Sequence, residues 1–387
     1  KRYQDAYDDY KRNGLVAKDF EVEAFVKRER FDLDVKGFDK TYPRMVYHRQ
    51  YKVILMLLRY LKPAEHAMLK WKKRYKDFGT NTRFFAKGLN NCARSRIIHE
   101  KFSHFKNPVC YSLDCASFER SVDELWIQAE GRFWASFYKG AHRKFILWAF
   151  NIMRTTKGST KLGTKFFRRG GRPSGDPNTG GGNSFIMFMI MFSYYLATGI
   201  RMDIFDDGDD CLLIVEQGTL SFEHIYNFFE DRGFLLKLEN EAYTVSDIEF
   251  CQHTPIEYAG AYYMIRSPLT IFQKYTCCLA SVQERDLHLY YEEVAYCLLS
   301  VYGFIPELRA VLMPLAERFD GKVRFKSFYY GLHNVYAPRL PFGYASDFFY
   351  EEPNFLIKLG DQFNQFFVNG PLSIRYSVDV YDVFDID

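Results

Sequence analysis

The 387-residue chain is too long for one ordinary hydrophobic core, and a hydrophobic content of 48% is enough for two or three packed lobes. Its net charge is only +4, yet residues 1–110 hold 26 Lys and Arg against 13 Asp and Glu, which indicates either a polyanion partner or a solvated basic surface. The eight cysteines contain no C-x-x-C pair, which excludes the usual zinc motifs and favours reduced thiols over disulfides.

The N-terminal part of the chain gives few local signals. Residues 1–40 have no strong period, whereas residues 44–76 have a helical pattern in which Pro63 is expected to open a new helix. The chain starts at Lys1 without an initiator Met or a signal peptide, so we expect a fragment or a processed product.

The middle of the chain alternates strand and helix patterns. Residues 108–114 predict a short buried strand that ends in an acid, and residues 121–150 predict mostly helix. Residues 154–172 are basic and glycine-rich, which indicates a loop or a hairpin. Residues 173–182 predict a glycine-rich turn that leads into a helix starting at Asn183.

An apolar run at residues 184–200 fits either a membrane span or a buried helix. It is short for a span and contains Ser193 and two tyrosines, so we expect a buried helix. Residues 201–215 then predict a β-hairpin, with Asp207 and Gly208 as a favoured tight-turn pair. The remaining expected elements are a helix at 221–232, a strand at 234–238, a hairpin at 248–264, helices beyond 270 and a poorly ordered acidic tail at 378–387.

Three acids occupy positions with little conformational freedom. Asp114 ends the predicted strand, and Asp209 and Asp210 lie at the turn of the predicted hairpin. Nucleotide polymerisation is a chemistry that uses two divalent cations, and Mg²⁺ accepts a few carboxylates together with phosphate oxygens. Taken alone, a Gly-Asp-Asp sequence is more often an ordinary charged turn.

A second set of polar residues surrounds these acids in the sequence. Glu119 follows Asp114 across a strand end, while Ser174, Thr179 and Asn183 follow a loop that opens a helix. Hydroxyl and amide groups of this kind can read a ribose 2′-hydroxyl, and we expect Asn183 and Thr179 to share a network with Glu119. The alternative is a capped helix start, because Ser, Thr and Asn all cap helices well.

Cations are spaced along the N-terminal segment. Lys27, Arg28 and Arg44 can grip a triphosphate, because Arg makes forked contacts and Lys acts as a point charge. The alternative is a solvated run of charges.

These blocks occur in an order that resembles the RNA-dependent RNA polymerases of plus-strand RNA viruses, most closely the tombusvirus-like group. The strings that carry the resemblance are FVKRE (25–29), YPRMV (42–46), RYLKPAEH (59–66), KGLN (87–90), SLDCASFE (112–119), RPSGDPNTGGGN (172–183), GDDC (208–211), GFLLKLE (233–239) and IEFCQ (248–252). The GDD alone is weak evidence, but its combination with the Asp114/Glu119 and Ser174/Thr179/Asn183 spacings is specific.

The resemblance implies a role for each candidate residue. Asp114, Asp209 and Asp210 would be the catalytic ligands of two Mg²⁺ ions, for which Mn²⁺ can substitute. Lys237 would be the proton donor to pyrophosphate, with an exposed strand lysine as the alternative. The NTP-binding set would be Lys27, Arg28, Arg44, Glu119, Ser174, Thr179 and Asn183.

The resemblance also implies an α+β fold shaped as a right hand with an antiparallel palm sheet. The implied domains are fingers at 1–108, palm at 109–124, a fingers insertion at 125–168, palm at 169–265, and a thumb with the C-terminal tail at 266–387. The implied partners are RNA template, nascent RNA, NTPs and other viral replicase proteins. The implied location is membrane-associated replication sites in the host cytoplasm, reached through parts of the replicase outside this chain, which has no expected membrane segment.

Two residues depart from the family pattern, and two rival functions stay open. Glu119 stands where the family usually has Asp, and Pro177 stands where close relatives often have Met, which stiffens the loop. A reverse transcriptase would normally place a bulky residue where Asn183 and Glu119 stand. A non-catalytic RNA-binding scaffold on a decayed polymerase fold need not keep the three acids.

Overall fold

The computed structural model describes residues 1–27, 44–72, 75–258, 260–275, 282–303, 305–320 and 324. Contacts divide the chain into two compact units, of which the first comprises residues 1–87 and 101–241 and the second residues 88–100 and 242–387. Helices and mainly antiparallel sheets occur together, so the expected α+β class is confirmed at that level. The unit boundary lies at residues 241/242, upstream of the thumb boundary expected near 265, and the fingers, palm and thumb divisions stay predictions.

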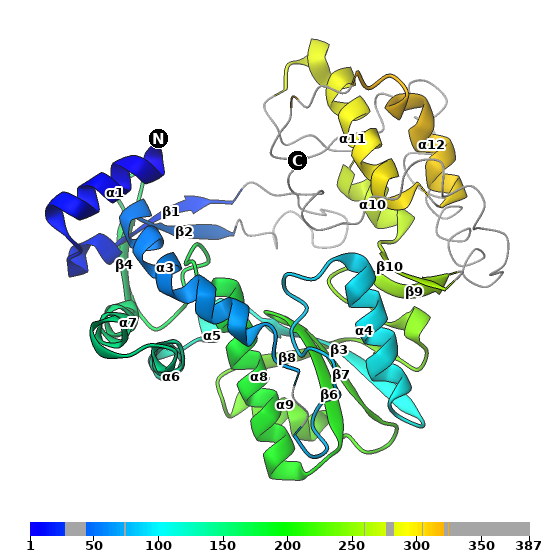
Figure 1. Ribbon diagram of the computed structural model, residues 1–387, viewed down its shortest axis with the longest axis horizontal. Helices are drawn as coiled ribbons and strands as arrows, with labels where there is room; N and C mark the ends of the chain where they lie inside the picture. Colours follow the sequence, from blue (N-terminus) through cyan, green and yellow to red (C-terminus); the bar gives the residue numbers. More distant parts are fainter. Residues whose placement is uncertain are drawn as a thin grey trace. The chain divides into compact units, whose positions relative to one another are not determined.

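A four-stranded sheet with the order β6-β7-β3-β8 lies at the centre of the first unit (Figure 1). Its strands are β3 (Pro108–Ala116), β6 (Met202–Asp207), β7 (Asp210–Glu216) and β8 (Leu235–Ala242). β7 is antiparallel to both β3 and β6. The predicted buried strand and the predicted hairpin are therefore confirmed, and β3 continues two residues beyond Asp114.

The two faces of this sheet have different environments, because successive side chains of a strand point to opposite faces. One face contributes Leu113, Cys211 and Leu213 to the main hydrophobic core. The other face carries Ser112 and Leu212. Continuing along this second face toward the hairpin, the next positions on β3 and β7 are acids, so the sheet presents carboxylates at one of its ends.

Helix α8 (Thr179–Thr198) contributes to the same core and contacts β6 (Figure 1). Its apolar side chains Ile186, Met187 and Ile190 are fully buried, which confirms the expected buried helix. None of the helices in the described residues is both long and apolar enough to span a bilayer. The expected start at Asn183 was wrong, because α8 begins four residues earlier and its three glycines are helical.

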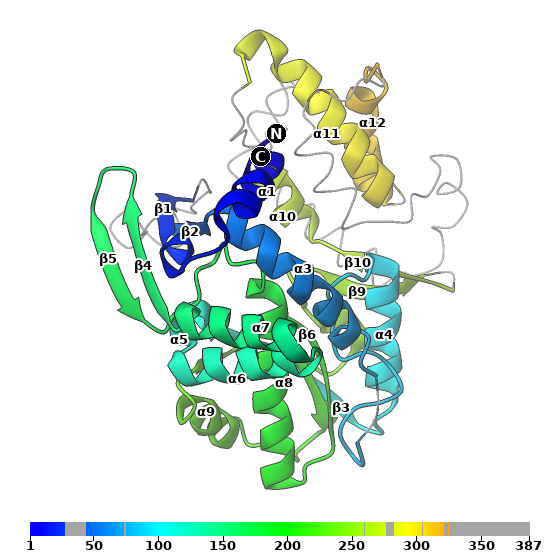
Figure 2. The same ribbon diagram turned by 60° about the vertical axis from the view of Figure 1, so that its left-hand side comes forward.

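Helices α6 (Glu124–Ser136) and α7 (Gly140–Met153) run side by side (Figure 2), and they confirm the prediction that residues 121–150 are mostly helical. The Asp123 side chain caps α6 by accepting a hydrogen bond from the Trp126 N–H. The hairpin of β4 (Thr155–Thr160) and β5 (Lys165–Arg169) follows, which confirms a hairpin at residues 154–172. The short helices α5 (Phe118–Ser121) and α9 (Phe222–Glu230) complete this part.

Two N-terminal strands, β1 (Val22–Val26) and β2 (Met45–Arg49), join β4 and β5 in a second sheet with the order β2-β1-β4-β5. The other N-terminal elements are α1 (Arg2–Asn13), the 3-10 turn η1 (Ala17–Phe20) and α3 (Tyr51–Met68). The expectation of helix from residue 44 was wrong, because residues 45–49 pair antiparallel with β1. Pro63 does not open a new helix either, since α3 continues through it.

The second unit has its own hydrophobic core, formed largely by helices. It takes Asn91–Glu100 from α4 (Asn91–Ser103), and the Ser95 hydroxyl donates to the Ile256 carbonyl at 2.9 Å. Its other elements are η3 (Val245–Asp247), β9 (Thr254–Tyr258), β10 (Ala261–Ile265), α10 (Pro268–Tyr275), η4 (Glu284–Asp286), α11 (Leu287–Tyr302) and α12 (Pro306–Ala316). The predicted hairpin and the helices beyond residue 270 are confirmed, and the acidic tail lies outside the described residues.

Candidate active site

The register of three strands brings the predicted catalytic acids to one end of the central sheet. Leu113 of β3 lies opposite Cys211 of β7, so the next residues along are Asp114 and Asp210. Asp207 of β6 lies opposite Asp210. Residues that face each other across an antiparallel pair point to the same face, which makes this end of the sheet strongly acidic.

The hairpin turn itself holds the third acid. Because Asp207 still pairs with Asp210, the turn consists of Gly208 and Asp209, one residue later than the expected Asp207–Gly208 pair. Gly208 has a φ of 95°, a conformation that costs a glycine little and other residues much more. Asp209 is therefore held in a tight two-residue turn beside the sheet end.

The acids around the hairpin repel one another. Burial raises the pKa of the Asp209 carboxyl, and its own backbone N–H acts in the opposite direction. The nearby negative charges of Glu119, Asp114 and Asp207 raise it further. Among the described residues, no three His, Cys, Asp or Glu side chains converge closely enough to enclose a metal ion. The mutual repulsion nevertheless fits a cation, because positive charge would relieve it and draw the oxygens together.

Lys237 lies on β8, the neighbour of β3, and its Nζ is 3.9 Å from Asp114 Oδ2. Its side chain is 58% exposed, so Lys237 is accessible to solvent beside the acidic sheet end. The structure thus brings Lys237 and Asp114 together, while the proton-donor role of Lys237 stays a prediction.

Glu119 and Asn183 are joined directly. The chain leaves β3, turns at Ser117 with a φ of 55°, and places Glu119 in the first turn of α5. Asn183 Nδ2 donates to Glu119 Oε1 at 3.2 Å. Asn183 is buried, and its Oδ1 has no hydrogen-bond partner in the described part of the chain. A buried amide oxygen without a partner costs stability, which is typical of a group kept for a ligand.

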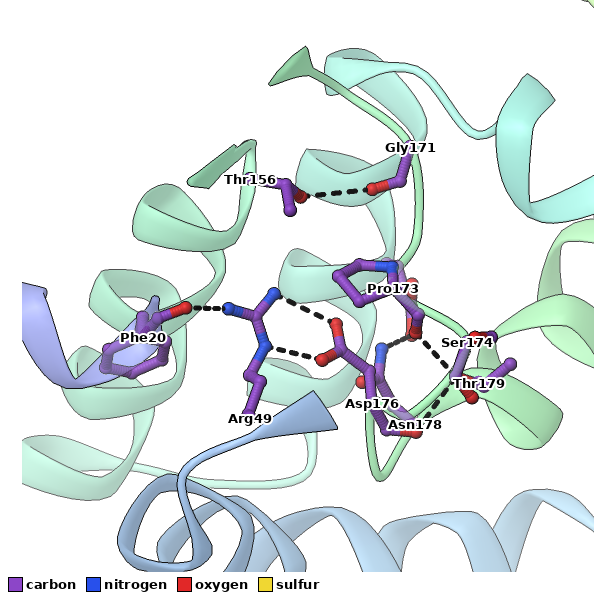
Figure 3. Close-up of polar contacts among 10 residues, drawn as sticks. Phe20, Arg49, Thr156, Gly171, Pro173, Ser174, Asp176, Asn178 and Thr179 are labelled. Carbon is purple, nitrogen blue, oxygen red and sulfur yellow. Dashed lines mark hydrogen bonds and ion pairs between the residues drawn. The ribbon is translucent and has the colours of Figure 1, made fainter. Parts of the chain in front are cut away.

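Ser174 belongs to the loop before α8, and Thr179 is the first residue of that helix (Figure 3). The Thr179 hydroxyl lies 2.9 Å from the Asp176 carbonyl and also within reach of the Pro173 and Ser174 carbonyls. The expected network of Thr179 with Glu119 was therefore wrong, because this hydroxyl contacts carbonyls of the preceding loop instead. Ser174 is exposed at the loop surface.

The two described phosphate-binding candidates lie side by side. The Lys27 N–H donates to the Arg44 carbonyl at 2.8 Å, which extends the β1–β2 ladder to these two residues. Arg28, the third candidate, lies outside the described residues.

Sequence reasoning missed the buried ion pairs that hold the loop before α8. Arg49 Nε lies 2.5 Å from Asp176 Oδ1, and Arg172 Nη2 lies 2.6 Å from Glu130 Oε2. A Cβ at Gly182 would lie 2.3 Å from Glu130 Oε1, so the glycine leaves room for the second pair. The sequence does show charged residues within apolar or glycine-rich segments, which is a sign of buried ion pairs. The local sequence does not show which residues pair with each other.

A family model described as viral RNA-dependent RNA polymerase matches residues 1–327 of the chain. The chain belongs to this family. It is 31% identical over 295 residues to the RNA-directed RNA polymerase of Oat chlorotic stunt virus, an alignment that covers 73% of this chain and 38% of the relative. The enzymes of Tobacco necrosis virus (strain A) and Red clover necrotic mosaic virus are 26% and 30% identical, over 87% and 69% of this chain and 47% and 34% of the relatives. The chain thus spans less than half the length of these curated polymerases. Polymerases of this family generally use divalent metal ions.

Proposed function

We propose that this chain is the catalytic module of an RNA-dependent RNA polymerase that replicates a viral genome. In the proposed reaction, the 3′-hydroxyl of nascent RNA attacks the α-phosphate of an NTP selected by the template, and pyrophosphate leaves. The observation that carries the proposal is the meeting of Asp114, Asp209 and Asp210 at one sheet end, in a chain of this family.

The charge and the oxygen chemistry of this sheet end suit divalent cations. Asp114, Asp209 and Asp210 would hold two Mg²⁺ ions, or Mn²⁺ in their place. When bound, these ions would activate the attacking hydroxyl and neutralise the triphosphate. The protein's own contribution is to hold the three carboxylates on strand ends and a tight turn, where little reorganisation is needed.

The remaining candidate residues would position the nucleotide. Lys27, Arg28 and Arg44 would bind the triphosphate, and the Lys237 ammonium would protonate the leaving pyrophosphate. Ser174, Thr179, Asn183 and Glu119 would select ribose, with the Asn183–Glu119 hydrogen bond as the supporting contact. The Thr179 hydroxyl would contribute by shaping the loop on which Ser174 lies.

The proposed architecture is a right hand. Fingers at 1–108 and 125–168 would line the template and NTP channels, the palm would hold the central sheet, and the thumb would start near residue 266. Template RNA, nascent RNA and NTPs would be the ligands. Other replicase proteins would bring the chain to membrane-associated sites in the host cytoplasm.

Primer extension with NTPs, dNTPs and Mg²⁺ tests the proposal. We expect the chain to extend an RNA primer with NTPs far better than with dNTPs. A preference for dNTPs would indicate a reverse transcriptase, and RNA binding without any incorporation would indicate a scaffold. Asp209→Asn should remove incorporation, while Glu223→Gln, which removes an equal charge from the exposed surface of α9, should leave it unchanged.

A further inference from the structure

A buried, forked ion pair fixes the loop before α8 to strand β2 (Figure 3). Arg49, the last residue of β2, donates from Nε to Asp176 Oδ1 at 2.5 Å and from Nη2 to Asp176 Oδ2 at 3.1 Å. Its third nitrogen, Nη1, donates to the Phe20 carbonyl. Neither side chain is more than 1% exposed, so a nucleotide cannot reach the pair.

The loop backbone makes a second contact with the same strand. The Gly175 N–H donates to the Tyr47 carbonyl at 3.1 Å. A Cβ at Gly175 would lie 2.4 Å from that oxygen, so only glycine permits the approach. Both contacts come from the two residues directly after Ser174, which restricts where the Ser174 backbone can lie relative to β2.

The other end of β2 carries the phosphate-binding candidates. Arg44 precedes the strand, and its carbonyl is paired with the Lys27 N–H at 2.8 Å. A strand rises about 3.3 Å per residue, so Arg44 and Arg49 are separated by roughly 16 Å of extended backbone. Held in the β2-β1-β4-β5 sheet, this backbone is a stiff spacer between the cations and the loop.

We infer that Arg49 and Asp176 are positioning residues that set the distance between the sugar-reading loop and the triphosphate-binding cations. The inference rests on the proposed function. It goes beyond a contribution to stability, because a buried ion pair is often replaced by apolar residues without loss of stability. What apolar residues cannot reproduce is the forked geometry, which permits one orientation of Asp176 and hence of the loop.

The test separates geometry from stability. The double variant Arg49→Met with Asp176→Leu fills the buried space without charge, and Asp176→Asn keeps the shape but removes the charge. Single-nucleotide incorporation of CTP and dCTP is measured together with the melting temperature. We expect both variants to raise the KM for CTP and to reduce the CTP/dCTP ratio of kcat/KM by about tenfold, with a smaller change in kcat.

Another buried ion pair of the first unit provides the matched control. Lys101 Nζ lies 2.6 Å from Asp203 Oδ1, both side chains are at most 1% exposed, and neither residue belongs to the loop. Asp203→Asn should lower the melting temperature and leave the CTP/dCTP ratio unchanged.

The outcomes decide between the inference and the function on which it rests. A double variant that melts like the wild type and discriminates like it would overturn the inference, while leaving the polymerase function in place. If the double variant does not fold, Asp176→Asn decides in the same way. A wild-type chain that incorporates no nucleotide would overturn both.

Discussion

Carboxylates lie in opposite environments at the hairpin end of the central sheet and at the loop before α8. At the hairpin, burial and the nearby charges of Glu119, Asp114 and Asp207 raise the pKa of Asp209, and Asp207 faces Asp210 across β6 and β7. Beneath the loop, the buried carboxylates of Asp176 and Glu130 lie in ion pairs with arginines. Repelling charges lower stability and are kept where a ligand relieves them, whereas paired buried charges hold a defined geometry.

The largest expected effect is at the hairpin end of the central sheet, where the acids repel one another. Asp209→Ala should reduce nucleotide incorporation by a factor on the order of 10³ or more, because preorganised electrostatic stabilisation of the transition state is lost. The same change should leave the melting temperature unchanged or raise it, since one of several repelling acids is removed. Primer extension and thermal unfolding measure the two effects, and an active variant would remove Asp209 from the metal site.

At the buried ion pairs near the loop before α8, loss of a carboxylate should instead lower stability. Glu130 accepts hydrogen bonds from Arg172, Asn178 and Trp134, so Glu130→Ala should cost about 3–5 kcal/mol in the free energy of unfolding. Glu124→Ala on the same helix is the control, because its contact with Arg154 is 3.6 Å long and about one-third exposed. We expect the control to cost less than about 1 kcal/mol. If urea denaturation shows equal losses in the free energy of unfolding for Glu130→Ala and Glu124→Ala, the expected difference between the buried and the exposed ion pair is contradicted.

The buried amide of Asn183 donates from Nδ2 to Glu119, while its Oδ1 has no hydrogen-bond partner among the described residues. Asn183→Ala should lower kcat/KM for NTPs more than for dNTPs and shrink sugar discrimination roughly ten- to a hundredfold, because the hydroxyl-reading groups are lost. Ser193→Ala, which removes a hydroxyl bonded within α8, should leave the ratio unchanged. Glu119→Asp should be tolerated. An unchanged CTP/dCTP ratio in Asn183→Ala would make Asn183 a helix residue only.

The smallest effect is expected at the cations that we propose to bind the triphosphate. Arg44→Ala should raise the KM for all four NTPs about equally and by roughly tenfold, because a phosphate contact does not distinguish bases. Filter binding should show almost unchanged affinity for template RNA. A KM change that depends on the base would move Arg44 out of the triphosphate site.

Local sequence patterns were enough to predict the strands that carry the acids and the buried helix after them. The short buried-strand pattern before Asp114 and the turn residues near Gly208 identified the strands that carry the acids, and the apolar run after residue 183 identified a buried helix. The start of α8 was missed because glycines usually break helices, whereas here their missing side chains leave room for neighbouring charged side chains, namely Lys87 at Gly180, Glu65 at Gly181, and Glu130 and Arg172 at Gly182.

Contacts between distant segments could not be predicted. Residues 45–49 have a pattern compatible with a helix, but pairing with β1 makes them a strand. The Arg49–Asp176 pair joins residues 127 positions apart, and no periodicity reports such a contact. Asp207 was expected only as a turn residue, and strand register shows that it faces Asp210.

The most direct test of the acidic sheet end is anomalous diffraction from crystals of the chain grown with Mn²⁺, an RNA primer–template and an NTP. We expect anomalous peaks in contact with the carboxylates of Asp114, Asp209 and Asp210, next to the triphosphate. A complex in which the nucleotide and the ions bind elsewhere, and in which these three carboxylates contact no metal, would contradict the proposed catalytic site.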